Sequence, residues 1–362
     1  MRIAFDVSPL SHPPLGIGNY IRGSLGGLVQ AADGRHEIVA FAPTSLRGPG
    51  RIREALAGID VDLRLWPLPA SHAFRTLWSR VGRPPAERFL GSFDVLHFSD
   101  WMYPAQAKGL RATTIHDLVP LHFPDWCTER TIAMHTRKFE NTALTCDLVF
   151  VNSAFTGADV TRTLGIPPEK IRVARPGLRT AFRPDGERAS LERPYALTVA
   201  TLEPRKNLTT LLEAHSKLAD ELLLAVVGAE GWGEQPLLDR PGVRKLGFVP
   251  DEELARLYRG AEVVVYPSRF EGFGIPIVEA MACGVPVVAS AHHSLDEACG
   301  DASVRVDPED PDAIARGIHR ALADREQLAG AGLEHARSFR WHEAGKVFLT
   351  AFEAALRSAQ DR

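Results

Sequence analysis

Cysteine and long apolar runs are both scarce in this sequence. It has four cysteines in 362 residues, and no two of them form a Cys-x-x-Cys pair. We therefore expect free thiols in a reducing, cytoplasmic compartment, without a disulfide framework or a zinc site. No stretch approaches the roughly 18 consecutive apolar residues of a membrane-spanning helix. The chain is expected not to span a membrane, which leaves peripheral contact with the inner face of a membrane open.

A large excess of charge of either sign is also missing. The formal net charge is −3, and it is divided unevenly: residues 1–180 carry a net +5 and the remainder a net −8. A mildly basic first half fits an anionic acceptor or a membrane surface, but five charges spread over such a domain are more often a solvated face. No nucleic acid partner is expected.

Patterns typical of strands and helices alternate along the whole chain. The length and the 45% hydrophobic content allow large cores and indicate two domains rather than one. A strand expected over residues 2–7 opens a doubly wound α/β domain. A run rich in Pro, Gly and Arg at residues 175–186 then breaks the periodicity. We place the boundary there, which predicts domains at 1–180 and 181–340, with a last amphipathic helix within 341–362.

One glycine-containing loop organises the second half. It follows residues 262–267, whose β-branched density and terminal Pro predict a buried strand. Gly272 and Gly274 leave backbone N–H groups uncovered, and Pro276 suits a first helical turn, where its missing N–H would be unpaired anyway. The helix is therefore expected to begin near Ile275. Its free N–H groups and positive dipole end predict a phosphate site, with a dipole contribution of about 0.3–1 kcal/mol.

Two glutamates flank this predicted anion site, Glu271 in the loop and Glu279 in the helix. A carboxylate repels a phosphate, so each is expected to accept hydrogen bonds from hydroxyls, one from a sugar ring and the other from a ribose. A nucleoside diphosphate sugar supplies all three groups. Taken alone, either glutamate is equally well explained without a ligand, Glu271 as a solvated loop residue and Glu279 as a first-turn acid that favours the helix dipole. The whole pattern is much rarer by chance.

The pattern resembles the E-x7-E signature of the retaining nucleotide-sugar glycosyltransferases of sequence family four. The resemblance implies the GT-B fold, in which two Rossmann-like, parallel-sheet α/β domains face a cleft and the last helix crosses back onto the first domain. It also implies that Glu271 lies by the donor sugar and that Glu279 holds the ribose. The family's Gly-Phe-Gly corresponds to Gly272, Phe273 and Gly274, which would contact the donor.

Two adjacent cations follow the first strand expected in the second domain, at residues 195–200. Both side chains can reach a diphosphate, Arg205 with the two parallel donors of its guanidinium and Lys206 with the compact charge of its ammonium group. Surface Arg-Lys pairs are common, but a strand end in the same domain as Glu271 favours a functional role. The family has a lysine at the position of Lys206. The arginine that it often has beside the strand is absent here, where residues 200–201 are Ala-Thr.

Glycines also follow the first strand of the first domain. Gly16 and Gly18 allow the backbone to approach a ligand closely. They suggest a dinucleotide fingerprint, but Ile21 occupies the position of the third glycine, and no acid closes the second strand at residues 36–42. We therefore disfavour a dehydrogenase. The resemblance implies instead that Gly16 and Gly18 approach the donor phosphates and the acceptor.

A histidine ends another expected strand of the first domain, at residues 112–116. Ligands of open parallel sheets bind at such strand ends. The imidazole of His116 suits a sugar hydroxyl or a leaving phosphate, and Asp117 is expected to orient it. The family has a histidine here that contacts the donor sugar. The alternative is a structural His-Asp pair, and a third option, a general base, would make the enzyme invert the anomeric carbon.

The resemblance assigns one further contact. Val249, in a Gly-Phe-Val turn, corresponds to a turn whose backbone meets the nucleobase in the family. We expect Glu271, His116 and Lys206 to take part in catalysis and the remaining candidates to bind the donor. No acidic motif suggests Mg²⁺, so a metal-independent reaction without a cofactor is predicted.

A basic amphipathic helix is predicted at residues 73–81. Its apolar side chains recur at helical spacing, and arginines lie on it or follow it: Phe74, Leu77, Trp78 and Val81, with Arg75, Arg80, Arg83 and Arg88. Such a helix can dock on anionic lipid. A helix that buries its apolar stripe in the core is the more common case.

Together these features predict a retaining glycosyltransferase that moves a hexose from a nucleoside diphosphate sugar to a hydroxyl of a glycan, lipid-linked or small-molecule acceptor. The donor is expected in the second domain and the acceptor in the first. Residues 5–9 and 16–20 look most like bacterial mannosyltransferases of polysaccharide and O-antigen assembly, so GDP-mannose is the first donor expected. Two other classes stay open: a nucleotide-sugar epimerase of similar fold, and a catalytically silent nucleotide-sugar-binding relative.

Overall fold

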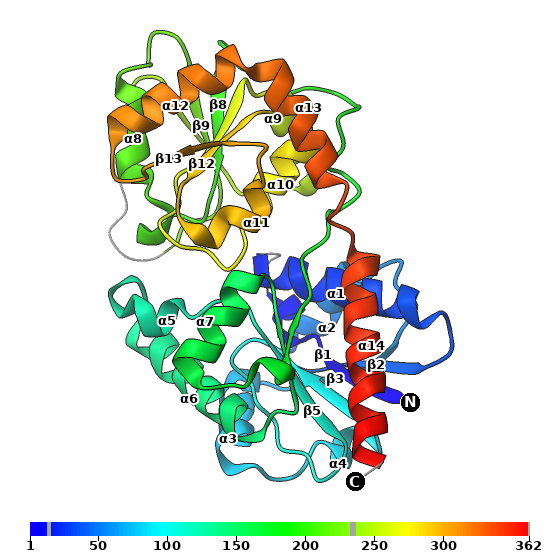
Figure 1. Cartoon of the computed structure of the whole chain (residues 1–362). Helices are drawn as coiled ribbons and strands as arrows, with labels where there is room; N and C mark the ends of the chain where they lie inside the picture. Colours follow the sequence, from blue (N-terminus) through cyan, green and yellow to red (C-terminus); the bar gives the residue numbers. More distant parts are fainter. Residues whose placement is uncertain (13–15, 232–236, 361–362) are drawn as a thin grey trace. The chain divides into compact units, whose positions relative to one another are not determined.

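The computed structural model describes residues 1–12, 16–231 and 237–360. The last two residues of the predicted final helix, 361–362, therefore lie outside the described part. The chain forms two compact units, each a parallel sheet with helices packed on it (Figure 1). The first unit comprises Met1–His122, Glu129–Gly177 and Arg340–Arg362, and the second comprises Phe123–Thr128 and Leu178–Phe339.

The first unit contains a seven-stranded parallel sheet in the order β3-β2-β1-β4-β5-β6-β7. Its strands are β1 (Arg2–Asp6), β2 (Glu37–Thr44), β3 (Asp62–Pro67), β4 (Val95–Phe98), β5 (Leu110–Ile115), β6 (Leu148–Val151) and β7 (Ile171–Val173). Its helices are α1 (Gly16–Ala32), α2 (Gly48–Ala55), α3 (Ser71–Val81), α4 (Glu87–Leu90), α5 (Val119–His122), α6 (Glu129–Thr145), α7 (Ala154–Leu164) and α14 (Trp341–Gln360).

The second unit contains a six-stranded parallel sheet in the order β10-β9-β8-β11-β12-β13. Its strands are β8 (Tyr195–Val199), β9 (Leu223–Val227), β10 (Val243–Gly247), β11 (Val263–Tyr266), β12 (Val287–Ser290) and β13 (Val304–Val306). Its α-helices are α8 (Leu208–Ser216), α9 (Asp251–Gly260), α10 (Ile275–Ala282), α11 (Asp296–Cys299), α12 (Pro311–Ala323) and α13 (Arg325–Ala336), and two short 3-10 helices, η4 (Pro204–Lys206) and η5 (His293–Leu295), border the site described below.

The central strands of each sheet are largely apolar on both faces because both faces are covered. In β9, Leu223, Ala225 and Val227 enter one core cluster, whereas Leu224 and Val226 enter another. Two-sided burial accounts for the continuous aliphatic runs of these strands, which lack the alternation of a half-exposed sheet.

In each sheet the strand order reverses at one place, between β1 and β4 in the first unit and between β8 and β11 in the second. Ligands of open parallel sheets bind beyond the carboxyl ends of the strands at such a switch point. The loops after these four strands are therefore the first places to search for a site.

Helix α3 differs from the expectation of one apolar stripe. Trp78 is buried and Phe74 packs against the same core cluster, but the side chains of Leu77 and Val81 are 62% and 57% exposed. Arg75 is buried, with its guanidinium 5.0 Å from the centre of the Trp101 ring. The interpretation of a fully core-facing stripe is therefore wrong, because only one side of α3 packs on the sheet.

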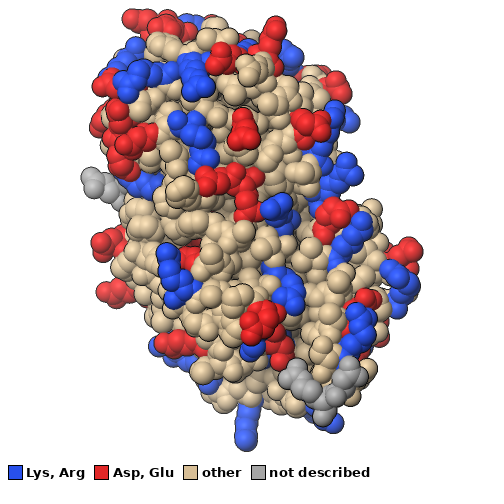
Figure 2. Space-filling model, in the orientation of Figure 1, with Lys and Arg blue, Asp and Glu red and all other residues tan. Residues whose placement is uncertain are grey.

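The face of the molecule seen in Figure 2 shows no large field of one charge. In the view of Figure 2, basic and acidic residues are interspersed over both units. None of the helices in the described part of the chain has the length and apolarity that a bilayer crossing needs.

Helix α14 returns the chain to the first unit and packs closely against α1. A Cβ on Gly27 of α1 would lie 1.9 Å from the Trp341 carbonyl oxygen, and a Cβ on Gly345 of α14 would lie 2.0 Å from the Gly27 carbonyl oxygen. Only glycine permits this approach. Phe348 and Phe352 of α14 are fully buried in the core of the first unit.

We predict that Gly345→Ala lowers the free energy of unfolding by about 1–3 kcal/mol, because the added methyl group overlaps the α1 backbone. Gly330 of α13 is the matched control, since a Cβ there meets nothing within 4 Å. Gly330→Ala should raise stability by up to about 1 kcal/mol through helix propensity. Denaturant unfolding of both variants measures the two effects, and a Gly345→Ala variant as stable as the wild type would contradict the tight α1–α14 packing.

Candidate active site

The carboxylate of Glu271, in the loop after β11, is the centre of a buried network. Oε1 accepts hydrogen bonds from Lys206 Nζ at 2.6 Å and from the Tyr266 hydroxyl at 2.9 Å, and Oε2 accepts from Arg205 Nη1. The Glu271 N–H donates to Ser294 Oγ at 3.1 Å. The residue is only 6% exposed, so it is not a solvated loop residue.

Both cations of the network come from η4, directly after β8. Arg205 also pairs with Glu203 at 2.5 Å, and Lys206 donates to the Tyr266 hydroxyl at 2.8 Å. Asn207, which ends η4 with φ of 57°, donates its side-chain N–H to the Pro267 carbonyl at 3.3 Å. This bond joins the loop after β8 to the loop after β11, and the two loops meet at the switch point of the second sheet.

Opposing influences set the ionisation of this network. Burial alone would raise the pKa of Glu271, but Arg205 and Lys206 outweigh it and bring that pKa to about 2. Burial lowers the pKa of Lys206, and Arg205 lowers it further, against the opposite effect of Glu271 and Glu203. Glu271 is therefore a fully ionised carboxylate at neutral pH.

The glycine loop leads into α10, which begins at Ile275 as the pattern predicted. Gly274 has φ of 102°, which favours glycine, and a Cβ there would also lie 2.8 Å from Leu295 Cδ2, so that the Leu295 side chain would have to move. The Phe273 ring is buried in the core, 5.5 Å from the Phe339 ring centre. A ligand at this helix start would therefore meet the backbone of Gly272 and Phe273 and not the Phe273 ring.

Glu279 lies in α10 and belongs to a second, separate ion-pair network. Its Oε1 accepts from Arg179 Nη2 at 2.5 Å, and its Oε2 accepts from the Tyr258 hydroxyl at 3.3 Å. Arg179 also pairs with Asp251. Burial raises the pKa of Glu279 despite the ion pair with Arg179.

Sequence reasoning missed Arg179 and Tyr266. Arg179 lies in the Pro/Gly/Arg-rich run that was assigned only as a domain boundary, and nothing in its local sequence points to Glu279. Tyr266 is the last residue of β11, where the apolar run suggested only a buried strand residue. The sequence feature that could have indicated Tyr266 is its hydroxyl group at the carboxyl end of a strand, where ligands of open parallel sheets bind.

Val249 lies just beyond β10. Its side chain is half-buried against the core of the second unit, whereas the neighbouring Phe248 side chain is 53% exposed. The predicted nucleobase contact rests on the backbone of this turn.

Gly16 and Gly18 form the first turn of α1, in the first unit. A Cβ on Gly16 would meet nothing within 4 Å, and a Cβ on Gly18 would make only an ordinary contact of 3.7 Å with Leu10. Packing against the described residues therefore requires glycine at neither position. Such open space is compatible with the close ligand approach predicted there.

His116 follows β5, but Asp117 does not orient its ring. His116 Nδ1 lies 3.2 Å from Asn152 Oδ1, and Asp117 instead accepts the Val119 N–H at 3.1 Å, at the start of α5. The expected His-Asp pair is therefore wrong, because the Asp117 carboxylate is used as a local helix cap. His116 Nε2 is buried and has no hydrogen-bond partner among the residues that the structure describes. Burial, reinforced by Lys138, lowers the pKa of His116 to about 3.

The predicted residues fall into two groups. One group lies in the second unit: Arg205, Lys206 and Glu271, which meet in one network, and Glu279, Val249 and residues 272–275, which lie outside that network. The other group, Gly16, Gly18 and His116, lies in the first unit. Across the described ranges, no three His, Cys, Asp or Glu side chains converge as metal ligands do.

Two family models together match most of the chain. "Glycosyltransferase Family 4" matches residues 16–182 and "Glycosyl transferases group 1" matches residues 183–334. The O-antigen chain mannosyltransferase B of Escherichia coli is 33% identical to this chain, in an alignment that covers 98% of this chain and 100% of the relative. The D-inositol 3-phosphate glycosyltransferase of Thermobifida fusca is 29% identical over 76% of this chain and 72% of its own.

Solved structures agree with the architecture. Sucrose-phosphate synthase from Thermosynechococcus elongatus aligns with a TM-score of 0.72 at 22% identity, covering 99% of both chains. Anabaena HepE in complex with UDP-glucose aligns with a TM-score of 0.68 at 17% identity, covering 100% of both chains. These alignments confirm the predicted GT-B fold.

We predict that Glu271→Gln lowers the free energy of unfolding at pH 7 by about 3 kcal/mol, because it leaves two buried cations beside a neutral amide. The pKa of Glu271 is depressed from 4.5 to about 2 by folding. The stabilisation is therefore complete above pH 4.5 and disappears as the pH falls toward 2.

Denaturant unfolding at several pH values checks this: the gap between wild type and variant should narrow on acidification. Glu230→Gln is the control, since Glu230 pairs with Lys245 at 3.0 Å but its side chain is 78% exposed. It should cost less than about 1 kcal/mol. Equal costs for the two variants would show that the Glu271 network does not stabilise the fold.

Proposed function

We propose, because the chain belongs to the glycosyltransferases of family 4 and group 1, that it transfers a hexose from a nucleoside diphosphate sugar to a hydroxyl acceptor with retention at the anomeric carbon. In this proposal the second unit binds the donor and the first unit binds the acceptor, which is a glycan, a lipid-linked sugar or a small molecule.

The observation that carries the proposal is the Glu271 network beside the start of α10. A carboxylate held ionised at the carboxyl end of β11 is an acceptor for sugar hydroxyls. The neighbouring start of α10 offers a positive dipole end to the diphosphate. A nucleoside diphosphate sugar carries both hydroxyls and a diphosphate, so its binding site needs a carboxylate and a positively polarised helix start close together.

Departure of the nucleoside diphosphate needs positive charge near its phosphates. Lys206 donates to Tyr266 and to Glu271 among the described residues, and an ammonium group has three donors. The third N–H of Lys206 is thus available for a donor phosphate. Arg205 stands next to it and is oriented by Glu203 and Glu271.

Glu279 suits the ribose in this proposal. Each of its two oxygens accepts one hydrogen bond, from Arg179 and from Tyr258. A carboxylate oxygen has room for a second donor, so the two ribose hydroxyls can add to a side chain that is already fixed in place.

The ionisation of His116 favours retention over inversion. A general base works best when its pKa is close to the operating pH, whereas burial lowers the pKa of His116 to about 3. His116 is therefore proposed to bond a hydroxyl of the donor sugar as a neutral imidazole. The leaving phosphate then takes the acceptor proton on the same face of the sugar, and this frontside displacement preserves the anomeric configuration.

GDP-mannose is the proposed donor. The mannosyltransferase of Escherichia coli matches this chain along its whole length at 33% identity, whereas the HepE structure with UDP-glucose matches at only 17%.

We predict that GDP-mannose stabilises the protein more than UDP-glucose does. At a hundredfold excess over Kd, a ligand that binds only the folded state adds about 2.7 kcal/mol. A thermal-shift panel of GDP, UDP and ADP sugars, with the free nucleotides as controls, measures this. A larger shift with UDP-glucose would refute the mannose donor and leave the family unaffected.

We also predict that the product of transfer from an α-linked donor has the α configuration. NMR of the anomeric proton and carbon of the product decides this. A β product would make the enzyme inverting and would give His116 back the role of a base. Conversion of the donor to an isomer without any acceptor would identify an epimerase, and the absence of any turnover would identify a silent relative.

A further inference from the structure

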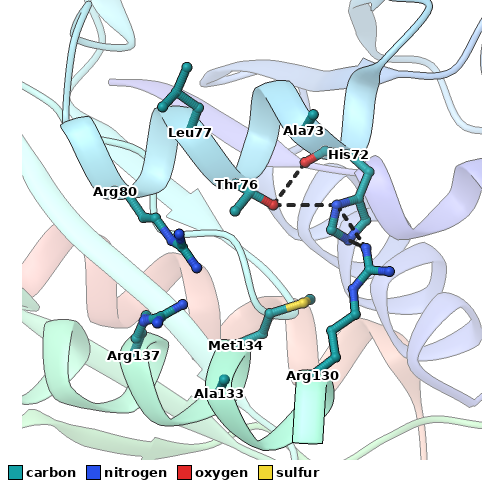
Figure 3. Close-up of a pocket in the computed structure, with 9 residues that line it drawn as sticks. All are labelled: His72, Ala73, Thr76, Leu77, Arg80, Arg130, Ala133, Met134 and Arg137. Carbon is teal, nitrogen blue, oxygen red and sulfur yellow. Dashed lines mark hydrogen bonds between the residues drawn. The ribbon is translucent and has the colours of Figure 1, made fainter. Parts of the chain in front are cut away.

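A groove between α3 and α6 of the first unit contains none of the residues assigned to the proposed reaction. It has a volume of about 520 Å³ and is shown in Figure 3. His72, in the first turn of α3, is hydrogen-bonded to Arg130, in the first turn of α6, at 2.7 Å. The two helices therefore start side by side and run in the same direction along the groove.

The groove is positively charged. Arg80 of α3 and Arg130 and Arg137 of α6 line it, and none of the nine described lining residues is acidic. Figure 3 shows the guanidinium groups of Arg80 and Arg137 pointing toward each other from opposite walls. Neither has an ion-pair partner among the residues that the structure describes. Two facing cations without a carboxylate favour an anion between them, and guanidinium groups match phosphate oxygens well.

The same two helices also expose apolar side chains. Leu77 lines it and is 62% exposed, and Val81, one turn further along α3, is 57% exposed. Leu144 lies two turns beyond Arg137 on the same side of α6 and is 84% exposed. Aliphatic side chains and arginines are therefore exposed together on this face of the two helices.

We propose that this face, the α3–α6 surface formed by Arg80, Arg130, Arg137, Leu77, Val81 and Leu144, binds the surface of a bilayer that contains anionic phospholipids. The arginines pair with lipid phosphates, and the aliphatic side chains enter the boundary between headgroups and acyl chains. A soluble phosphate would satisfy the arginines but would leave the aliphatic side chains in water. An anionic bilayer satisfies both.

The proposal goes beyond the glycosyl transfer proposed above and does not depend on it. The Glu271 network lies in the other unit, so a variant of the α3–α6 surface should bind donor and transfer sugar to a soluble acceptor as the wild type does. Failure of lipid binding and failure of the transferase proposal are therefore separate results.

The test is co-sedimentation of the full-length protein with vesicles of phosphatidylcholine, with and without phosphatidylglycerol, at low and high salt. We expect binding only when phosphatidylglycerol is present, and weaker binding at high salt because surface charges are screened. Removing one arginine near an anionic surface should weaken binding about fivefold. The double variant Arg80→Gln/Arg137→Gln should therefore lose at least about tenfold in apparent affinity at low salt.

The matched control is Arg316→Gln/Arg320→Gln in α12 of the second unit, whose two side chains are 70% and 71% exposed. It removes the same charge and should bind vesicles as the wild type does. Leu77→Gln/Leu144→Gln should weaken binding at both salt concentrations, because apolar insertion is not screened. Circular dichroism melting of each variant verifies that the fold is unchanged.

Several outcomes would overturn the proposal. They are the absence of wild-type binding to the phosphatidylglycerol vesicles, equal loss in the α12 control, and unchanged binding of the α3–α6 variants. Binding of inorganic pyrophosphate or polyglutamate to the groove without vesicle binding would assign it to a soluble phosphate or to an acidic protein instead, and would also overturn it.

Discussion

The ion pairs between the Glu271 carboxylate and the cations Arg205 and Lys206 are the interaction on which the candidate site depends. Burying these charges is expensive, and the cost is offset only because each has an opposite charge or a hydroxyl within hydrogen-bond distance. The network holds Glu271 ionised and fixes both of its oxygens. It also ties the loop after β8 to the loop after β11, so that the two halves of the second sheet meet at one chemical centre.

Backbone geometry places that centre. β8 and β11 are neighbours in space although two strands, β9 and β10, and two α-helices lie between them in the chain, and only parallel crossover connections bring their carboxyl ends together. Gly274 then turns the chain into α10 in a left-handed conformation that favours glycine. The positive dipole end of α10 thereby lies next to a carboxylate that is already oriented.

The candidate site was predictable where local chemistry is enough. Strand ends, the glycine turn, the Pro at the helix start and the adjacent Arg205-Lys206 are written in consecutive residues, and so is the spacing of Glu271 and Glu279. Partners far apart in the sequence were not predictable. Arg179 reaches Glu279 across 100 positions, and Asn152 replaces Asp117 beside His116 because Asp117 is used by the N–H of Val119.

Helix α3 shows the same limit on the surface. Periodicity placed Leu77 and Trp78 on one apolar stripe, since both fit helical spacing, but the sheet covers only the side that contains Trp78. The sequence by itself determined the two α/β domains, the start of α10 and the residue types of the candidate site, because these depend on local propensity and spacing. The tertiary structure decided which charges are paired, which imidazole stays neutral and which apolar side chains remain exposed, because pairing and burial depend on neighbours that only the folded chain brings together.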